Sequence, residues 1–276
     1  MIRINQVKLP VEHTTEALHK KVQELLKYKG SMDVEIVKRS LDARKKPQLF
    51  YVYMLDVTIP EKEERKLLKR CRSSQIQKVE PVKYVFPVKH YEGQKRPVIV
   101  GMGPAGLFCG YVLAKAGFRP ILLERGKCVE ERSRDVEAFW KTGHLNTESN
   151  VQFGEGGAGT FSDGKLNTLI KDKYGRNKEV LRIFVKHGAP KEILYDYKPH
   201  IGTDILKKIV RSMREEILAS GGDVRFETRV TDLLIADGRI KGLVLNGQEE
   251  LLAEHVVLAL GHSARDTFSM LLKQKI

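Results

Sequence analysis

The sequence predicts an α/β protein with two domains: a small α+β domain, residues 1–92, and a larger domain built on a parallel sheet, residues 93–276. The length of 276 residues suits two domains. Strand and helix patterns alternate over about the first 90 residues, and a strand, a glycine-rich turn and a helix begin near residue 97. The stretch between them, residues 91–96, is polar and contains Gly93, as is typical of a linker.

The first domain is expected to contain four strands and two helices in the order βαββαβ. Apolar residues follow a helical spacing in residues 14–27, and Pro60 suits the start of a charged helix that ends at residue 70. Strands are indicated where β-branched or aromatic residues alternate with polar ones, in residues 2–9, 33–41, 48–59 and 78–88. This order predicts a ferredoxin-like fold, which assigns no function by itself.

The second domain begins with a strand, a turn and a helix that are typical of nucleotide binding. The buried strand of residues 97–100 leads into GMGPAG, residues 101–106, and then into a helix that ends at residue 115. A second strand, residues 118–123, ends at Glu124. This βαβ unit predicts a Rossmann-like dinucleotide-binding domain.

Each glycine of this turn has a physical role in the prediction. Gly101 permits the tight turn, Gly103 lets the backbone approach a diphosphate, and Gly106 lets the helix and strand pack closely. Free N–H groups at the start of the helix face the phosphates. Glu124, at the tip of the second strand, is placed to accept hydrogen bonds from an adenosine ribose.

Later segments extend this domain. A second glycine-rich loop, residues 150–167, exposes backbone N–H groups that suit further phosphate or the edge of a flavin ring. A helix over residues 203–219 leads to a third strand, residues 224–228, and the run 255–261 returns to the sheet and turns at Gly261. Asp-Gly and Asn-Gly turns between short strands predict a β-meander, in residues 230–236, 239–245 and 249–253.

Composition narrows the classes of function. No apolar run reaches the ~20 residues of a membrane helix, and the N-terminus has no signal-peptide core, so a cytoplasmic location is expected. The three cysteines show no CxxC and no metal-ligand spacing, which argues against disulfides and a metal site. Cys109 is expected to be an inert thiol. Any redox chemistry therefore requires a bound cofactor.

The formal net charge of +14 is concentrated near the N-terminus, because the first 95 residues hold 21 of the 49 Lys and Arg but only 12 of the 35 acidic residues. These basic residues are mixed with acidic ones and lack an aromatic stacking motif. A solvated surface is therefore favoured over an anion-binding one. Nucleic-acid binding by the first domain stays open as an alternative.

Four motifs together resemble a known family: VIVGMGPAG at 98–106, continuing to Glu124-Arg125-Gly126; FGEGGAGTFSDGK at 153–165; KPHIGTD at 198–204; and ALGHSARDT at 259–267. The chain is similar to the bacterial NAD(FAD)-utilising, FAD-dependent dehydrogenases, within the flavoproteins that have two dinucleotide-binding domains. The resemblance covers nearly the whole chain. It implies that the nucleotide fold holds FAD rather than NAD.

The resemblance also implies where FAD would lie. Glu124 would bind the AMP ribose, Val230 would contact adenine through its backbone, residues 157–165 would run beside the diphosphate and flavin, and Gly261 would approach the middle of the cofactor. The implied cofactor-binding residues are Gly101, Gly103, Pro104, Ala105, Gly106, Glu124, Arg125, Gly126, Gly157, Thr160, Ser162, Lys165, Val230 and Gly261.

The implied reaction is hydride transfer through flavin N5, with an unidentified substrate and with NAD(P)H as a candidate electron donor. The sequence identifies no catalytic residue. His200 and His262 are candidates because histidine titrates near neutrality, although each is more often structural. Lys165 and Arg265 are candidates to balance phosphate or reduced-flavin charge.

Flavoproteins of this kind continue into a substrate domain and a returning segment that closes over the flavin, whereas this sequence stops soon after Gly261. The chain is therefore expected to be the N-terminal part of a longer enzyme, to bind FAD weakly or not at all when alone, and to show little NAD(P)H oxidation. Two alternatives stay open: an RNA-binding or tRNA-modifying flavoprotein that uses its basic first domain, and a plain NAD(P)-binding domain.

Overall fold

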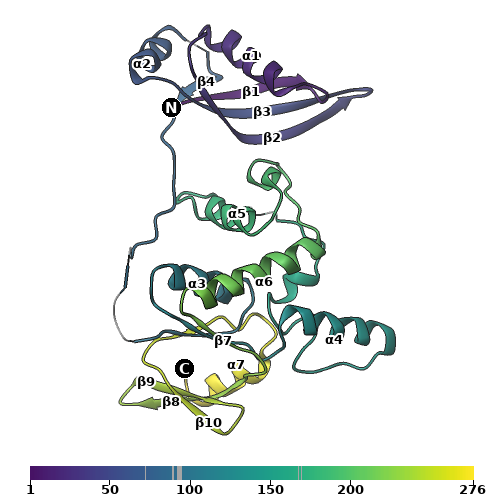
Figure 1. Cartoon of the computed structure of the whole chain (residues 1–276), viewed down its shortest axis with the longest axis vertical. Helices are drawn as coiled ribbons and strands as arrows, with labels where there is room; N and C mark the ends of the chain where they lie inside the picture. The colour runs from purple at the N-terminus through teal and green to yellow at the C-terminus, as the bar shows by residue number, and fades with distance from the viewer. Residues whose placement is uncertain (72, 89, 92–94, 167, 169) are drawn as a thin grey trace. The chain divides into compact units, whose positions relative to one another are not determined.

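The computed structural model describes residues 1–71, 73–88, 90–91, 95–166, 168 and 170–276, which form two compact units (Figure 1). The N-terminal unit comprises Met1–Tyr84, Leu166–Arg182 and Pro190–His200. The C-terminal unit comprises Val85–Lys165, Ile183–Ala189 and Ile201–Ile276. The expected domain boundary at residues 92 and 93 lies outside the described residues, so that boundary stays a prediction.

The N-terminal unit contains a four-stranded antiparallel sheet with strand order β2-β3-β1-β4. Its main elements are β1 (Ile2–Pro10), α1 (Thr15–Leu26), β2 (Asp33–Lys45), β3 (Gln48–Thr58), α2 (Glu61–Arg70) and β4 (Ile76–Lys78). A short 3-10 helix, η2 (Lys191–Leu194), and the first part of α5 (Arg176–Lys186) also belong to this unit.

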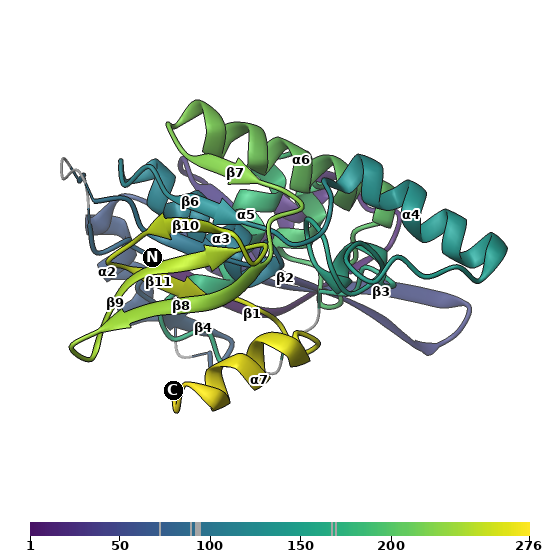
Figure 2. The same cartoon turned by 90° about the horizontal axis from the view of Figure 1, so that it is seen from below.

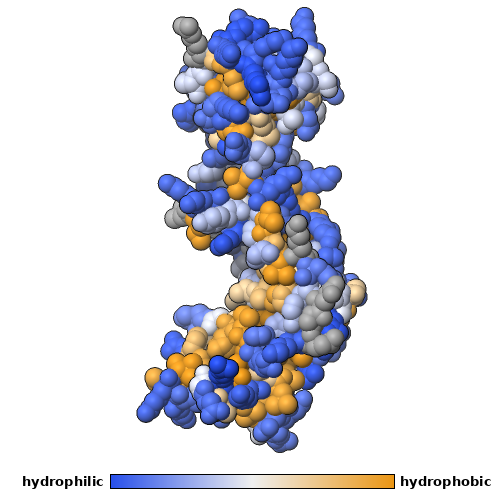
Figure 3. Space-filling model, turned by 90° about the vertical axis from the view of Figure 1, so that its left-hand side faces the viewer, coloured by the Kyte–Doolittle hydropathy of each residue, from blue (hydrophilic) through white to orange (hydrophobic). Residues whose placement is uncertain are grey.

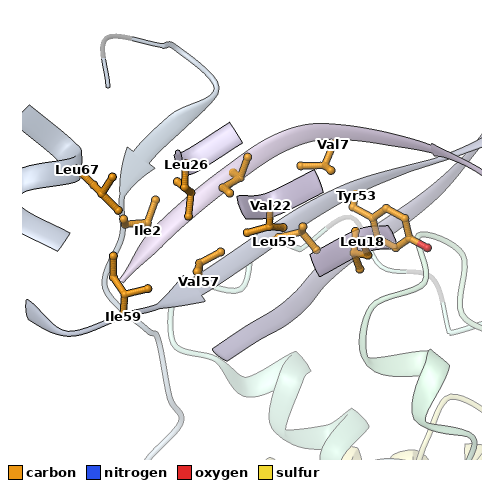
Figure 4. Close-up of a cluster of buried hydrophobic side chains, with 11 residues drawn as sticks. Ile2, Val7, Leu18, Val22, Leu26, Tyr53, Leu55, Val57, Ile59 and Leu67 are labelled. Atoms are coloured by element: carbon orange, nitrogen blue, oxygen red, sulfur yellow. The ribbon is translucent and has the colours of Figure 1, made fainter. Parts of the chain in front are cut away.

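One face of this sheet forms a hydrophobic core with the two helices. Figure 4 shows side chains of α1 pointing toward those of β1 and β3. The buried core residues are Ile2, Ile4, Val7, Leu18, Val22, Leu26, Tyr53, Leu55, Val57, Ile59 and Leu67. The spacing of the α1 residues matches one helical face, as the sequence predicts.

The strand predicted over residues 78–88 is wrong. The fourth strand is β4, which ends at Lys78, and the described residues after it up to 88 form no strand. Pro81 and Pro87 lack an N–H group, and proline within a strand removes a ladder hydrogen bond. The alternating pattern was therefore misread beyond Lys78.

The free edge of β2 is partly covered by a segment more than 150 residues later in the chain. Arg39 N donates to Tyr195 O at 2.7 Å, and Tyr197 N donates to Arg39 O at 3.0 Å. The Arg39 guanidinium donates twice to the Asp196 carboxylate, at 2.7 and 3.1 Å, and lies over the rings of Tyr51 and Tyr195. Residues 190–200 are thus an integral part of the N-terminal unit.

The C-terminal unit is a mixed α/β structure with a parallel sheet of order β11-β5-β6-β7 and an antiparallel sheet of order β10-β9-β8. Its elements are β5 (Val98–Val100), α3 (Pro104–Lys115), β6 (Ile121–Leu123), α4 (Val129–Thr142), η1 (Ala158–Phe161), the end of α5, α6 (Thr203–Ala219), β7 (Asp223–Arg225), β8 (Val230–Ala236), β9 (Arg239–Leu245), β10 (Glu249–Leu252), β11 (Val256–Leu258) and α7 (Arg265–Lys273).

The parallel sheet is covered on both faces. Figure 1 shows α3 and α6 on one side and the meander β8–β10 on the other. Val98, Val100, Ile121 and Leu123 form a buried cluster with residues of the meander. Figure 2 shows α7 running beside β8, where Gln274 donates to the Leu233 carbonyl at 3.2 Å. These layers leave the carboxyl ends of β5, β6 and β11 at one edge of the sheet.

The surface mixes hydrophilic and hydrophobic residues. Figure 3 shows blue hydrophilic residues over much of the face that it draws, with orange hydrophobic residues between them. Exposed large hydrophobic side chains include Leu252 and Leu272. In the part of the chain that the structure describes, no helix combines the length and apolar character needed to cross a membrane.

Candidate functional site

A cavity of about 410 Å³ lies at the carboxyl ends of the parallel strands. Val100 and Leu123, the last residues of β5 and β6, line it together with Ala259, which follows β11. In open parallel sheets, ligands bind outside the carboxyl ends of the strands. The volume lies within the ~300–1,000 Å³ range of small-molecule and cofactor sites. This cavity is therefore the candidate functional site.

The first glycine turn forms one wall of the cavity. Gly101 has a φ of +96°, and a methyl group there would lie 2.5 Å from the Ala259 carbonyl oxygen, so only glycine suits this position. Gly103 is the N-cap of α3, and Pro104 is its first residue. The first N–H groups of a helix have no partner within the helix and carry its positive dipole end. This wall can therefore bind an anion.

Gly106 holds the turn against the helix. A methyl group on Gly106 would lie far inside van der Waals distance of the Gly101 carbonyl oxygen, which is a backbone atom. The turn and α3 can therefore approach this closely only because residue 106 has no side chain, as the sequence predicts.

Glu124 connects three segments of the site. Its Oε2 accepts from Met102 N at 2.7 Å, and its Oε1 accepts from Gly126 N and Gly154 N, each at 2.9 Å. The side chain is 5% exposed and lines the cavity. A carboxylate has about four acceptor sites, so capacity remains for a ribose hydroxyl. Glu124 thus fastens the second glycine-rich loop to the first turn, a role that the sequence analysis missed.

The second glycine-rich loop contacts the first turn directly. Gly157 has a φ of +65°, and a methyl group there would lie 2.9 Å from Gly103 Cα. Gly156 N donates to Met102 O at 2.8 Å. Gly154, Gly157, Ala158 and Gly159 line the cavity with Gly103. The structure therefore brings the two glycine-rich segments to one site; Asn167, at the end of the loop, lies outside the described residues.

A buried carboxyl group, Glu155, lies on this loop. Its Oε2 accepts from Val129 N at 2.8 Å and from Arg214 Nη1 at 3.0 Å, whereas its Oε1 has no hydrogen-bond partner among the described residues. Burial raises the pKa of Glu155 to about 7, although Arg214 acts in the opposite direction. Arg214 also donates to Glu130 at 3.0 Å. The loop therefore holds a carboxyl group that titrates near neutrality.

An ion-pair network borders the cavity on another side. Arg125 donates to both carboxylate oxygens of Asp266, each at 3.0 Å, and to Glu148 at 3.0 and 3.1 Å. Arg229 donates to Glu148 at 3.1 Å. The Arg125 guanidinium also lies 4.2 Å from the centre of the Phe153 ring. Arg125 is thus held in place at the cavity by three side chains.

The residues assigned to cofactor binding from the resemblance fall into two groups. Eight of them line the cavity: Gly101, Gly103, Pro104, Glu124, Arg125, Gly157, Val230 and Gly261. The cavity lining does not include the other six: Ala105, Gly106, Gly126, Thr160, Ser162 and Lys165. The binding roles of all fourteen stay predictions.

The surroundings of Gly126, Thr160, Ser162 and Lys165 differ from one another. Gly126 N donates to Glu124. The Thr160 side chain is buried, with no hydrogen-bond partner for its Oγ1 among the described residues. Ser162 Oγ donates to Gly159 O at 2.8 Å, and exposed Lys165 forms an ion pair with Asp163 at 2.8 Å.

The other candidates lie in different places. His262 lines the cavity, whereas His200 belongs to the N-terminal unit. Burial raises the pKa of the Cys109 thiol, which disfavours the reactive thiolate. Arg265 begins α7 outside the cavity lining. Among residues with described positions, no group of three or more His, Cys, Asp or Glu is placed to hold a metal ion.

The donor set fits the adenosine-diphosphate part of a dinucleotide. An open Gly103, the start of a helix and a carboxylate with a remaining acceptor site meet at one cavity. Of the atoms whose positions are described, a methyl group on Gly103 would come within 4 Å only of Gly157 Cα, at 3.8 Å, so the space beside this turn is open. The residues present therefore fit the phosphate and ribose groups of FAD or NAD.

Comparison with known sequences gives two matches. Residues 1–58 match the model of a family described as Domain of unknown function (DUF8436). The whole chain is 43% identical over 279 residues to an "Uncharacterized protein" of Clostridium beijerinckii. The match covers 100% of this chain and 51% of the relative, so the chain spans about half the length of that relative.

Comparison with solved structures gives partial likenesses. THI4 of Thermovibrio ammonificans has a TM-score of 0.42 and 21% identity, covering 66% of this chain and 63% of that chain. A GidA-related protein of Thermus thermophilus has a TM-score of 0.35 and 16% identity, covering 61% and 54%. Thioredoxin reductase of Lactococcus lactis has a TM-score of 0.32 and 14% identity, covering 60% and 35%. Scores this low assign no function to this chain.

Proposed function

We propose that this chain is the FAD-binding part of a flavin-dependent oxidoreductase with a Rossmann-like nucleotide fold. The observation that carries the proposal is the convergence of the first glycine turn, Glu124 and the second glycine-rich loop on one cavity. A plain NAD site needs the first turn and the acidic residue but not a second glycine-rich loop. The second loop therefore favours FAD over NAD.

In this proposal the cavity residues bind the cofactor through distinct groups. Gly103 and the start of α3 bind the diphosphate, Glu124 accepts a ribose hydroxyl, and Val230 contacts adenine through its backbone. Residues 157–165 run beside the diphosphate and flavin, and Gly261 lies near the middle of the cofactor. Bound FAD would supply two-electron chemistry. The substrate is unassigned, and NAD(P)H is proposed as the electron donor.

The N-terminal unit is proposed to be a ferredoxin-like domain. Support comes from the element order β1-α1-β2-β3-α2-β4 and the antiparallel strand order β2-β3-β1-β4. This fold carries many functions, so the role of the unit in the oxidoreductase stays open.

The identity of the cofactor is tested by equilibrium dialysis of the purified chain against FAD and, separately, against NAD, because dialysis also detects weak binding. We expect FAD to bind weakly and saturably, and more tightly than NAD. Binding of NAD without binding of FAD would overturn the proposal in favour of a plain NAD(P)-binding domain.

Replacement of Gly103 by alanine separates binding from folding. The added methyl group makes only ordinary contact with Gly157, at 3.8 Å, and the φ of −68° suits alanine. Alanine is a poorer N-cap than glycine, so we expect a melting temperature a few degrees lower at most, roughly the effect of 1 kcal/mol or less. The FAD affinity should be at least about tenfold weaker, because the methyl group occupies the space of the diphosphate. Isothermal titration calorimetry and thermal unfolding measure the two effects. Equal FAD affinity of the variant and the wild type would contradict the proposed diphosphate position.

A further inference from the structure

Arg132 on α4 is a fully buried cation beneath the second glycine-rich loop. Its exposed fraction is 0%. Among the described residues, its guanidinium donates only to backbone carbonyl oxygens of this loop, those of Asn150 (2.8 Å), Val151 (2.9 Å), Gly154 (3.3 Å), Glu155 (2.6 Å) and Gly157 (2.9 Å). One side chain thus fixes the path of the loop that lines the cavity.

No described carboxylate forms an ion pair with Arg132. Arg214 differs, because it pairs with Glu155 and Glu130. Burying a charge without an opposite charge is costly, and carbonyl dipoles replace only part of the lost hydration. Burial accordingly lowers the pKa of the Arg132 guanidinium to about 10, although Glu124 and Glu155 oppose this shift. The guanidinium nevertheless remains charged at neutral pH.

The hydrogen bonds of Arg132 also orient the peptide groups of the loop. In a trans peptide the N–H group points away from the preceding C=O group. Because the Gly157 carbonyl oxygen is turned toward Arg132, the N–H of Ala158 is turned away from it. Gly157, Ala158 and Gly159 line the cavity. Arg132 therefore keeps electronegative carbonyl oxygens away from the side of the loop that faces an anion.

We infer that Arg132 is a positioning residue and a buried counter-charge for the diphosphate of a bound dinucleotide. The inference rests on the proposed function, because it takes the cavity to hold a dinucleotide. The guanidinium acts through the loop rather than by touching the ligand. A positive charge in a region of low dielectric attracts an anion more strongly than a solvated charge does.

The inference is tested with ADP and adenosine, which differ in the diphosphate, by calorimetry on the full chain. We expect ADP to bind more tightly than adenosine to the wild type. In Arg132→Met the ratio of the two affinities should fall at least about tenfold, and in Arg132→Lys, which keeps the charge, it should stay within about threefold of the wild type. Arg211→Met is the matched control, because Arg211 on α6 is 57% exposed and its loss should leave the ratio unchanged.

Salt dependence of the wild-type chain gives a second measurement that needs no variant. Buried charges are screened less than solvated ones. The ratio of ADP affinity to adenosine affinity should therefore fall less than about threefold between about 50 and 500 mM KCl. A fall of about tenfold or more would assign the effect to solvated arginines such as Arg229 and would overturn the inference. An unchanged ratio in folded Arg132→Met, or equal binding of ADP and adenosine by the wild type, would also overturn it.

A parallel titration with FAD separates this inference from the proposed function. A chain that prefers ADP in an Arg132-dependent manner but binds NAD and not FAD would refute the flavoprotein and keep the role of Arg132. A chain that binds FAD equally well with methionine at position 132 would refute the role of Arg132 and keep the flavoprotein.

Discussion

Replacement of Gly106 by alanine is expected to lower the free energy of unfolding of the C-terminal unit by about 3 kcal/mol or more. The added methyl group would overlap the Gly101 carbonyl oxygen, and a backbone atom cannot rotate away as a flexible side chain can. The first turn and α3 would have to separate. Urea unfolding followed by fluorescence of Trp140, the single tryptophan, measures the loss, because Trp140 lies on α4 in this unit.

Gly159→Ala is the matched control for this change. In the described part of the chain, no atom lies within 4 Å of a methyl group added to Gly159, and the φ of Gly159 is not in the left-handed region. The free energy of unfolding of Gly159→Ala should therefore stay within about 0.5 kcal/mol of the wild-type value. Equal stability of Gly106→Ala and Gly159→Ala would show that the first turn and α3 are not packed as described.

Replacement of Glu155 by glutamine is expected to change how the stability of this unit depends on pH. The pKa of Glu155 rises from 4.5 to about 7 because the side chain is buried. Between pH 4.5 and about pH 7 the folded chain holds a proton that the unfolded chain has lost. The contribution of Glu155 to stability therefore falls as pH rises over this range and levels off above the folded-state pKa. The stability of Glu155→Gln relative to the wild type should therefore increase by about 2 to 3 kcal/mol from pH 5 to pH 8.

Glu216→Gln provides the opposite case. Hydrogen bonds from Lys186 and Lys115 outweigh partial desolvation and lower the pKa of Glu216 to about 2, so its contribution is lost only as pH falls below its ordinary value of 4.5. Between pH 5 and pH 8 the stability of this variant relative to the wild type should change little. Urea unfolding at pH 5 and pH 8 measures the free energy of unfolding of each variant relative to the wild type. If this difference changed with pH in the same way for both variants, Glu155 would not carry a proton at pH 5.

Local patterns predicted much of the fold. The glycine spacing at 101–106 predicted the turn and α3, and the Asp-Gly and Asn-Gly pairs predicted the turns of the meander, where Asp237 and Asn246 have positive φ. The strand predicted over residues 78–88 is wrong, because Pro81 and Pro87 in that segment lack the N–H groups that a strand ladder needs. The helices α4, α5 and α7 were not predicted, and η1 lies in a segment that was read only as a loop.

The interior of the candidate site was harder to predict. Arg132 and Glu155 look like ordinary charges in the sequence, and their roles depend on which distant backbone groups the fold brings to them. Glu124 was predicted as a ribose ligand, but nothing local indicates that it also accepts N–H groups from Met102 and Gly154. Residues that contact a ligand are therefore easier to identify from sequence patterns than residues that hold the ligand-binding loops in place.

During synthesis on the ribosome, Arg39 is made well before Tyr195 and Tyr197, the residues with which its backbone pairs. Ribosomes add about 5–20 residues per second, so Tyr197 follows Arg39 by about 8 to 30 s. During that interval β2 has an unpaired edge that a second nascent chain could join. Charged residues along β2, such as Glu35, Lys38 and Asp42, oppose such pairing until residues 195–197 arrive.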